Sequence, residues 1–338
     1  MEIINKILDK SSLTVLVEKL NASGKEVYAP VNRKGITEFE KVANLQEMDF
    51  DCIATKQSAK SLVFPKVEKL MNFEKTFDDV IVKNIDPSTF PEVVAFGTRP
   101  CDAAGFIPLN AIFTTDNVDE IFKARLDNLT IISISCKKAD DFCFCTSVNG
   151  GPGNTSGSDI LLTEMSSTEY YAEIITEKGK SILDANAALF KDSAPLDKTP
   201  LVAKIEQQFT EEVINEKLKT LFESDIWDSQ AMRCVGCGAC AFVCPACGCF
   251  DIQDETKGKD GVRHRCWDSC GFKLFTLHTS GHNPREKQAQ RWRQRIYHKF
   301  SYQPEQQKQF GCVGCGRCSR ACPSDMNIAE HLTQIAKG

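Results

Sequence analysis

The cysteines are the residues of this sequence whose type and spacing suggest chemistry. The chain has 17 cysteines among 338 residues, and eight of them fall into two copies of the pattern C-x2-C-x2-C-x3-C-P. The first copy runs from Cys234 to Pro245 and the second from Cys312 to Pro323. Bacterial ferredoxins bind two [4Fe-4S] clusters with this spacing. The pattern therefore predicts two iron–sulfur clusters.

The same pattern predicts how the eight thiolates divide between the two clusters. Three thiolates on a tight, glycine-bearing loop cover three iron corners of one cluster, and the fourth, on the turn that follows, points to the other. We expect the first cluster to be bound by Cys234, Cys237, Cys240 and Cys322. We expect the second to be bound by Cys312, Cys315, Cys318 and Cys244.

Structural zinc is the main alternative, because zinc also binds pairs of cysteines that are two residues apart. A zinc ion needs four ligands around one tetrahedral centre. It needs neither a third cysteine two residues further on, nor a proline after the fourth, nor a second copy of the whole pattern. The spacing therefore favours iron–sulfur clusters over zinc.

Four more cysteines predict a third [4Fe-4S] cluster in the first part of the chain, namely Cys101, Cys136, Cys143 and Cys145. Cys101 and Cys136 follow two expected strands, and open α/β sheets place their sites beyond the carboxyl ends of such strands. The Cys143-x-Cys145 spacing is not a ferredoxin spacing, so zinc or unliganded thiols are the alternatives here.

The five remaining cysteines are Cys52, Cys247, Cys249, Cys266 and Cys270. We interpret Cys52 as an ordinary buried thiol. The other four either bind a further metal or are small buried residues that pack against the clusters, and we favour the second interpretation.

Two regions are expected to position these cysteines. Residues 1–225 are predicted to form an α/β domain, with helices over Leu13–Leu20 and 116–126 and strands over Val27–Val31, Val80–Val82, Val93–Phe96 and Leu129–Ser135. Apolar spacing from Val202 to Phe222 predicts an amphipathic helix, and we place the boundary after it, near Asp225. Residues 226–338 are predicted to form a ferredoxin-like α+β domain with two clusters and a long insertion at 250–308.

Charge and hydropathy exclude several classes of function. A net charge of −5 gives no overall attraction to nucleic acid. Basic residues gather between Gly261 and Phe300, and Arg291, Arg293 and Arg295 either offset the negative charge of the clusters or form a solvated helix face. No apolar run is long enough to span a membrane and no secretory signal is recognisable, so we expect a cytoplasmic protein with no membrane partner.

No flavin or nucleotide site is expected in this chain. The glycine-rich run Gly150–Gly157 lacks the residues of a phosphate-binding loop and the spacing of a dinucleotide fingerprint. We interpret it as a loop beside Cys145. No catalytic acid, base or nucleophile is assigned either.

The cysteine segments resemble those of the dicluster [4Fe-4S] electron-transfer subunits, a family typified by the β subunit of sulfhydrogenase and by its counterpart in anaerobic sulfite reductase. The segments that carry the resemblance are Cys244–Asp251, Cys266–Cys270, Gly281–Arg285 and Arg295–Lys299, with Arg99–Asp102 and Cys143–Thr146 earlier in the chain. The resemblance implies a flavoprotein partner that exchanges electrons with NAD(P)H, and a further catalytic or ferredoxin-linked redox subunit.

We therefore expect an electron-relay subunit of an oxidoreductase of the hydrogenase, sulfite reductase or transhydrogenase type. An alternative is an enzyme that itself reduces sulfur or disulfide substrates at Cys247, Cys249 and Cys270. A free ferredoxin-like carrier is a third class, which the long first region disfavours.

Overall fold

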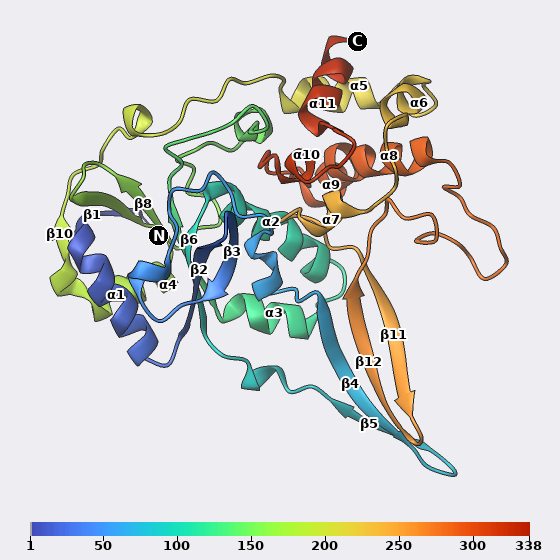
Figure 1. Cartoon of the computed structure of the whole chain (residues 1–338), viewed down its shortest axis with the longest axis horizontal. Coiled ribbons are helices and arrows are strands. Elements are labelled where there is room, and N and C mark those ends of the chain that lie inside the picture. Colours follow the sequence, from blue (N-terminus) through green and yellow to red (C-terminus); the bar gives the residue numbers. More distant parts are fainter. Residues whose placement is uncertain (1) are drawn as a thin grey trace.

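The computed structural model describes residues 2–338 and contains two sheets (Figure 1). The larger sheet has eight strands in the order β10-β1-β9-β8-β7-β6-β2-β3. Their bounds are β1 Ile4–Asp9, β2 Glu26–Arg33, β3 Ile36–Lys41, β6 Val93–Thr98, β7 Leu129–Ile134, β8 Ile160–Glu164, β9 Glu169–Ile174 and β10 Phe190–Asp192. Strands β2, β6, β7 and β8 run parallel, and the outer strands pair antiparallel.

Helices cover both faces of this sheet because its central strands are buried on both sides. Helices α1 (Lys10–Ala22) and α4 (Glu177–Ala185) pack in the core that includes Val94 and Ile132. Helices α2 (Pro100–Thr114) and α3 (Glu120–Asp127) pack in a second core that includes Ala95 and Ile131. Neighbouring residues of one strand thus enter different cores, as the alternation of side chains along a strand requires. The mixed α/β class predicted for the first region is confirmed.

Most elements predicted for the first region are present. The expected helix over Leu13–Leu20 is α1, and the strands expected over Val27–Val31, Val93–Phe96 and Leu129–Ser135 are β2, β6 and β7. The helix expected over 116–126 is α3, which begins later because the Asp119 side chain accepts a hydrogen bond from the Phe122 backbone and caps it.

The helix predicted from Val202 to Phe222 is wrong over its first half. Helix α5 covers only Glu211–Leu218, with Thr210 as its N-cap. The residues before it follow the loops of the first region instead: Ala203 N donates to Cys136 O at 2.7 Å, and Gln208 N donates to Ser147 Oγ at 2.9 Å. Hydrogen bonds to these loops replace the helical ones, so the apolar periodicity overstated the helix.

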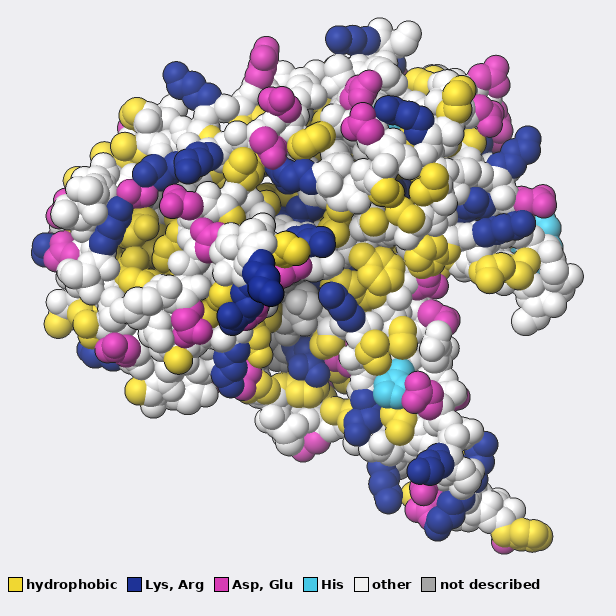
Figure 2. All heavy atoms as spheres, in the orientation of Figure 1, with side chains coloured by type: hydrophobic (Ala, Val, Ile, Leu, Met, Phe, Trp, Pro, Cys, Tyr) yellow, Lys and Arg dark blue, Asp and Glu magenta, His cyan; other side chains and the backbone are white. Residues whose placement is uncertain are grey.

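The second sheet is an antiparallel arm with the strand order β11-β12-β4-β5. Its strands are β4 Val67–Lys75, β5 Val80–Asn84, β11 Phe250–Lys257 and β12 Asp260–Trp267. The strand predicted over Val80–Val82 therefore exists, outside the main sheet. The arm projects from the body of the molecule (Figure 1), and basic, acidic and hydrophobic side chains are mixed on its surface (Figure 2).

The arm joins segments that lie far apart in the sequence. Strands β11 and β12 lie within the predicted insertion at 250–308, yet β12 pairs with β4 of the first region. At its base, Arg265 and Arg125 both form ion pairs with the buried Glu68. The domain division near Asp225 stays a prediction.

The helices after Asp225 are short. They are α6 Ile226–Ala231, α7 Ala239–Phe242, α8 Gln288–Tyr297, the π-helical turn His298–Tyr302, α9 Gln303–Gln307, α10 Arg317–Arg320 and α11 Ile328–Lys337. Trp292, Ile296 and Leu332 pack in one core, which Phe144 of the first region also enters. Within residues 2–338, no helix combines the length and apolarity needed to cross a membrane.

Candidate metal centres

The two cysteine motifs fold into equivalent loops, each followed by one short helix. Gly236 and Gly238 have φ angles of +67° and +74°, and Gly314 and Gly316 have φ angles of +63° and +69°. Side chains rarely adopt this backbone conformation, so glycine is required where the loop turns tightly. Helices α7 and α10, which follow the loops, pack against each other and bring the fourth cysteine of each motif toward the other loop.

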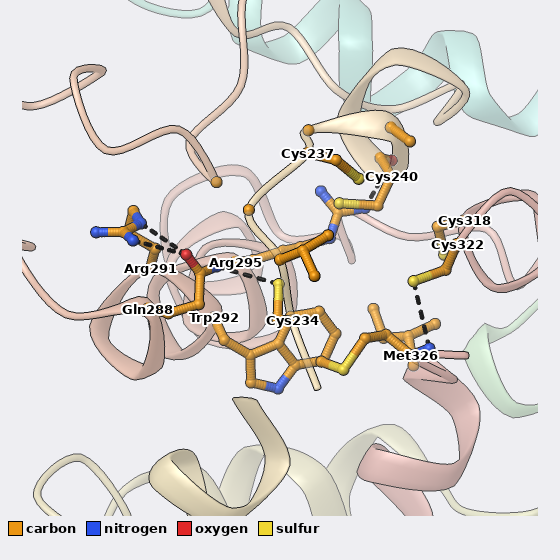
Figure 3. Close-up of a pocket in the computed structure, with 16 residues that line it drawn as sticks. Cys234, Cys237, Cys240, Gln288, Arg291, Trp292, Arg295, Cys318, Cys322 and Met326 are labelled. Carbon is orange, nitrogen blue, oxygen red and sulfur yellow. Dashed lines mark hydrogen bonds between the residues drawn. The ribbon is translucent and has the colours of Figure 1, made fainter. Parts of the chain in front are cut away.

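The structure brings together the four cysteines predicted for the first cluster. Cys234, Cys237, Cys240 and Cys322 line one pocket, and Cys318 reaches its wall (Figure 3). Gln288 Nε2 donates to Cys234 Sγ at 3.1 Å, and the Met326 backbone N donates to Cys322 Sγ at 3.3 Å. Such hydrogen bonds to sulfur stabilise the thiolate form. The ligand assignment itself stays a prediction.

The cysteines predicted for the second cluster line a smaller pocket nearby. These are Cys244, Cys312, Cys315 and Cys318, with Phe144 and Lys299 also on the wall. Lys299 Nζ lies 3.6 Å from Cys244 Sγ and donates to Gly311 O at 2.5 Å. Burial raises the pKa of Cys318 to about 12. A bound metal must therefore displace protons that these buried thiols otherwise hold.

The four cysteines predicted for a third cluster also lie together. Cys101 is in the first turn of α2 and Cys136 directly follows β7, so both lie at the carboxyl ends of parallel strands. Cys143 and Cys145 lie in the following loop, close enough to Cys136 that their charges act on one another. Burial raises the pKa of Cys136 to about 11 and that of Cys145 to about 12. The thiols are thus grouped as the strand-end argument predicted.

The glycine-rich run beside this third group is a loop, as expected. Gly150 N donates to Cys145 O at 2.9 Å, and Cys136 N donates to Pro152 O at 2.8 Å. These contacts hold the Cys136 and Cys145 segments against each other.

Two arginines link the second and third cysteine groups, and the sequence analysis missed both. Arg317 Nη2 donates to Asp102 Oδ2 at 2.8 Å, and both side chains are 2% exposed. Arg320 makes two 2.6 Å hydrogen bonds to Asp140 and donates to Cys143 Sγ at 3.1 Å.

A comparison of the two motifs could have revealed these arginines. At the equivalent positions the first motif has Ala239 and Phe242. The second motif thus carries two positive charges, where it contacts the first region, that the first motif lacks.

Backbone contacts also dock the second motif on the third group. Phe144 N donates to Gly314 O at 2.9 Å. A Cβ atom at Gly314 would lie 2.5 Å from the backbone of Cys145, whereas at the equivalent Gly236 the nearest atom is the flexible Gln288 side chain at 3.1 Å.

Gly314→Ala is therefore expected to destabilise the protein by about 3 kcal/mol, from backbone strain plus this steric overlap. Gly236→Ala is the matched control, because it introduces the same backbone strain without the overlap, and we expect it to cost about 1 kcal/mol. Anaerobic thermal unfolding of both variants measures the difference. Equal losses of stability would contradict this account of the docking.

Basic residues from α8 and the following turn are buried among the cysteines. Arg291 and Arg295 are 8% and 4% exposed, so a solvated helix face is wrong for both of them. Arg295 Nη2 donates to Cys240 O at 2.9 Å and Nη1 lies 3.5 Å from Cys247 Sγ. Burial alone would lower the pKa of Arg295, but the neighbouring Cys240 and Cys247 sulfurs raise it well above its usual value. Arg295 thus lies where negative charge is expected.

Arg295→Met is expected to lower the reduction potential of the adjacent centres by about 100 mV, because it removes a cation that stabilises the reduced state. A unit charge roughly 6 Å away contributes about 3 kcal/mol at an effective dielectric constant of about 20. A redox titration followed by EPR measures the shift. Arg293→Met is the control, since Arg293 instead contacts Phe222 O and Glu223. Equal potentials in wild type and Arg295→Met would contradict this role.

The five unassigned cysteines fall into different surroundings. Cys52 is only partly buried, so the prediction of a buried thiol at this position holds only in part. Cys266 lies on β12 opposite Asp251. Cys247, Cys249 and Cys270 gather near Arg295 instead, where a hydrogen bond from the Cys249 thiol lowers the pKa of Cys270 to about 7.

The donor chemistry fits iron–sulfur clusters at the motif sites. The pockets present thiols on glycine-bearing loops, with buried cations such as Lys299 beside them. A [4Fe-4S] cluster with four thiolates carries net negative charge, which such cations offset. Among residues 2–338, no three His, Cys, Asp or Glu side chains are grouped so as to hold a single metal ion.

Comparisons with known proteins define the class of the second region. A family model described as a 4Fe-4S dicluster domain matches residues 233–326. The chain is also 28% identical over 320 residues to sulfhydrogenase 2 subunit beta of Pyrococcus furiosus, and the alignment covers 92% of each protein. No solved structure matches the chain.

The chain is thus an iron–sulfur protein with a dicluster domain. These matches support the resemblance to the dicluster [4Fe-4S] family typified by the sulfhydrogenase β subunit, which the cysteine segments predicted.

Proposed function

We propose that this chain is the iron–sulfur electron-transfer subunit of a multi-subunit oxidoreductase. It relays single electrons between a flavoprotein subunit that exchanges electrons with NAD(P)H and a catalytic or ferredoxin-linked subunit. The complex is of the hydrogenase, sulfite reductase or transhydrogenase type, and the similarity to a sulfhydrogenase β subunit favours the first. The protein works in the cytoplasm.

The observation that carries this proposal is the sequence of three adjacent cysteine groups. Cys318 reaches both motif pockets, so the first and second groups are neighbours. Cys315 of the second group lies close enough to Cys101 of the third for their charges to interact. When bound, [4Fe-4S] clusters supply one-electron transfer at potentials set by their surroundings. A contiguous series of such groups suits a relay.

The residues of the chain support this relay by burial and charge. Trp292 lines the first pocket and Phe144 lines the second, and both are at most 5% exposed. Excluding water lowers the local dielectric constant and strengthens the effect of each buried cation. The first group has the most accessible thiol, because Cys237 is the exposed cysteine among the proposed ligands.

The third cluster is part of the proposal and has its own test. Cys136→Ala in the full-length chain is expected to remove about four irons per chain, because one thiolate ligand of that cluster is lost. Cys52→Ala is the matched control, since Cys52 lies near this group but outside the proposed ligand set. Iron and sulfide analysis after anaerobic purification measures the loss. Unchanged iron in Cys136→Ala would remove the third cluster from the account.

The relay function is tested by purifying the tagged chain anaerobically from its own cells. We expect a flavoprotein and a further redox subunit to co-purify, and NADH or NADPH to reduce the clusters of the complex but not of the isolated chain. Reduction of the isolated chain by NAD(P)H would contradict the proposal, as would a monomer without partners.

A second candidate function rests on the gathering of Cys247, Cys249 and Cys270. Neighbouring thiols beside buried cations favour thiolate chemistry with sulfur or disulfide substrates. Turnover of sulfite, polysulfide or a disulfide by the isolated chain, with a chemical reductant, would support this enzyme over the relay.

A further inference from the structure

Three cysteines outside the twelve predicted cluster ligands converge at the open end of the β11–β12 hairpin. Phe250 at the start of β11 pairs with Trp267 at the end of β12, and Asp268 N then donates to Cys249 O at 3.0 Å. The hairpin thus places Cys249, which precedes β11, beside Cys270, which follows β12. Their thiols are close enough to share a hydrogen bond.

Cys247 completes this group from the loop after the first motif. It is 6% exposed, and its charge acts on both Cys249 and Cys270. Cys266 is not a member, because it lies along β12 with Asp251 and Glu255 as its charged neighbours. Three thiols from separate segments are therefore held together by the fold.

Three buried cations surround the same thiols. Lys60, Arg295 and Lys299 are 3%, 4% and 2% exposed. In the described part of the chain their hydrogen-bond partners are backbone carbonyls and cysteine sulfurs, and none of them forms an ion pair with a carboxylate. Arg295 Nε is buried and has no hydrogen-bond partner among the described residues. Burying unpaired charge costs several kcal/mol, so negative charge is required here.

Lys60 brings a cation from the first region to the extra cysteines. It comes from the 3₁₀ turn Ala59–Leu62 of the first region and crosses to the loop after the first motif. Its Nζ donates to Cys247 O at 2.9 Å and Ala241 O at 3.2 Å, and lies 4.0 Å from the centre of the Trp267 ring. The sulfurs whose charges act on Lys60 belong to Cys247, Cys244 and Cys249. Two of these three belong to the extra group.

The donor set is composed of thiols alone, which selects soft metal centres such as iron–sulfur clusters. A C-x-C pair joined by a distant cysteine also occurs in the third group, at Cys143 and Cys145. We propose that Cys247, Cys249 and Cys270 bind a further iron–sulfur cluster through three thiolates. One iron of that cluster is left without a cysteine ligand from this group. This inference rests on the proposed iron–sulfur nature of the chain.

The test compares metal content in the full-length chain after anaerobic purification. The double variant Cys249→Ser/Cys270→Ser is expected to lose about four irons and four sulfides per chain, because a single remaining thiolate does not hold a cluster. Cys266→Ser is the matched control and is expected to keep the wild-type iron content. Equal iron in the double variant and wild type, or loss of zinc instead of iron, would overturn the inference.

If the double variant does not fold, the iron content of the wild-type protein provides a second test. Four clusters require about 16 irons per chain, whereas three require about 12. A wild-type count of about 8, or a count of about 12 that falls to about 8 in Cys136→Ala, would overturn this inference and leave the relay proposal standing. A chain without iron would instead overturn the proposed function itself.

Discussion

Replacing Cys322 with alanine is expected to remove the cluster that the first motif binds, although Cys322 is the last cysteine of the second motif. The reason is geometric, because Cys322 lines the same pocket as Cys234, Cys237 and Cys240. We expect a loss of about four irons per chain, together with the EPR signal of that cluster. Iron analysis and EPR of the dithionite-reduced protein measure both effects.

Two further variants show which cluster is lost. Cys234→Ala belongs to the same ligand set and is expected to reproduce the spectrum of Cys322→Ala. Cys312→Ala belongs to the other set and is expected to remove a different signal. A Cys322→Ala spectrum that matches Cys312→Ala would show that each motif binds its own cluster without exchange of the fourth ligand.

Replacing Arg317 with methionine is expected to destabilise the protein by about 3 to 5 kcal/mol, because it leaves a buried charge unpaired. Arg317 and Asp102 are both 2% exposed and 2.8 Å apart, and Asp102 has no other hydrogen-bonding cation among the described residues. Arg317 also donates to the Thr55 backbone oxygen at 2.9 Å, so its loss loosens a second contact with the first region. Anaerobic denaturant unfolding measures the change.

The control for this prediction removes both charges together. Arg317→Met/Asp102→Leu leaves no unpaired carboxylate, so it is expected to recover most of the stability that Arg317→Met loses. If the double variant is as unstable as the single one, the ion pair is not the cause and the loss of packing is.

The sequence predicted the metal chemistry well because ligand spacing is a local property. The repeated motif with its glycines identified the dicluster class, which the family comparison confirms. The strands ending before Cys101 and Cys136 were also predictable, since runs such as Leu129–Ser135 have strong apolar and β-branched character. Neither prediction needed knowledge of long-range contacts.

The features that sequence analysis missed depend on contacts between distant segments. The segment after Val202 is not helical, because its backbone bonds to the loops of Cys136 and Ser147. The arm could not be predicted as a single sheet, because β4 and β12 belong to separate parts of the chain. Periodicity describes one segment at a time and does not contain such pairings.

Burial of charged residues was the hardest feature to predict. Arg295 and Arg317 lie on short helices that look solvated in sequence, yet each lies beside cysteine sulfurs. Charged residues are almost never fully buried unless they are paired, so the sequence left a solvated face open for Arg295 and gave no indication that Arg317 is buried. Arg317 is paired with the Asp102 carboxylate, and Arg295 is expected to be paired with the negative charge of the clusters. The clusters are not residues, so the sequence does not show this second partner.

The most direct test of the central claim is EPR of the anaerobically purified full-length chain after reduction by dithionite. If the chain holds adjacent [4Fe-4S] clusters as an electron relay, the purified protein is brown and contains at least about eight irons, and after reduction it gives signals broadened by interaction between neighbouring clusters. A colourless protein that contains zinc, or one that stays EPR-silent after reduction, would contradict the account.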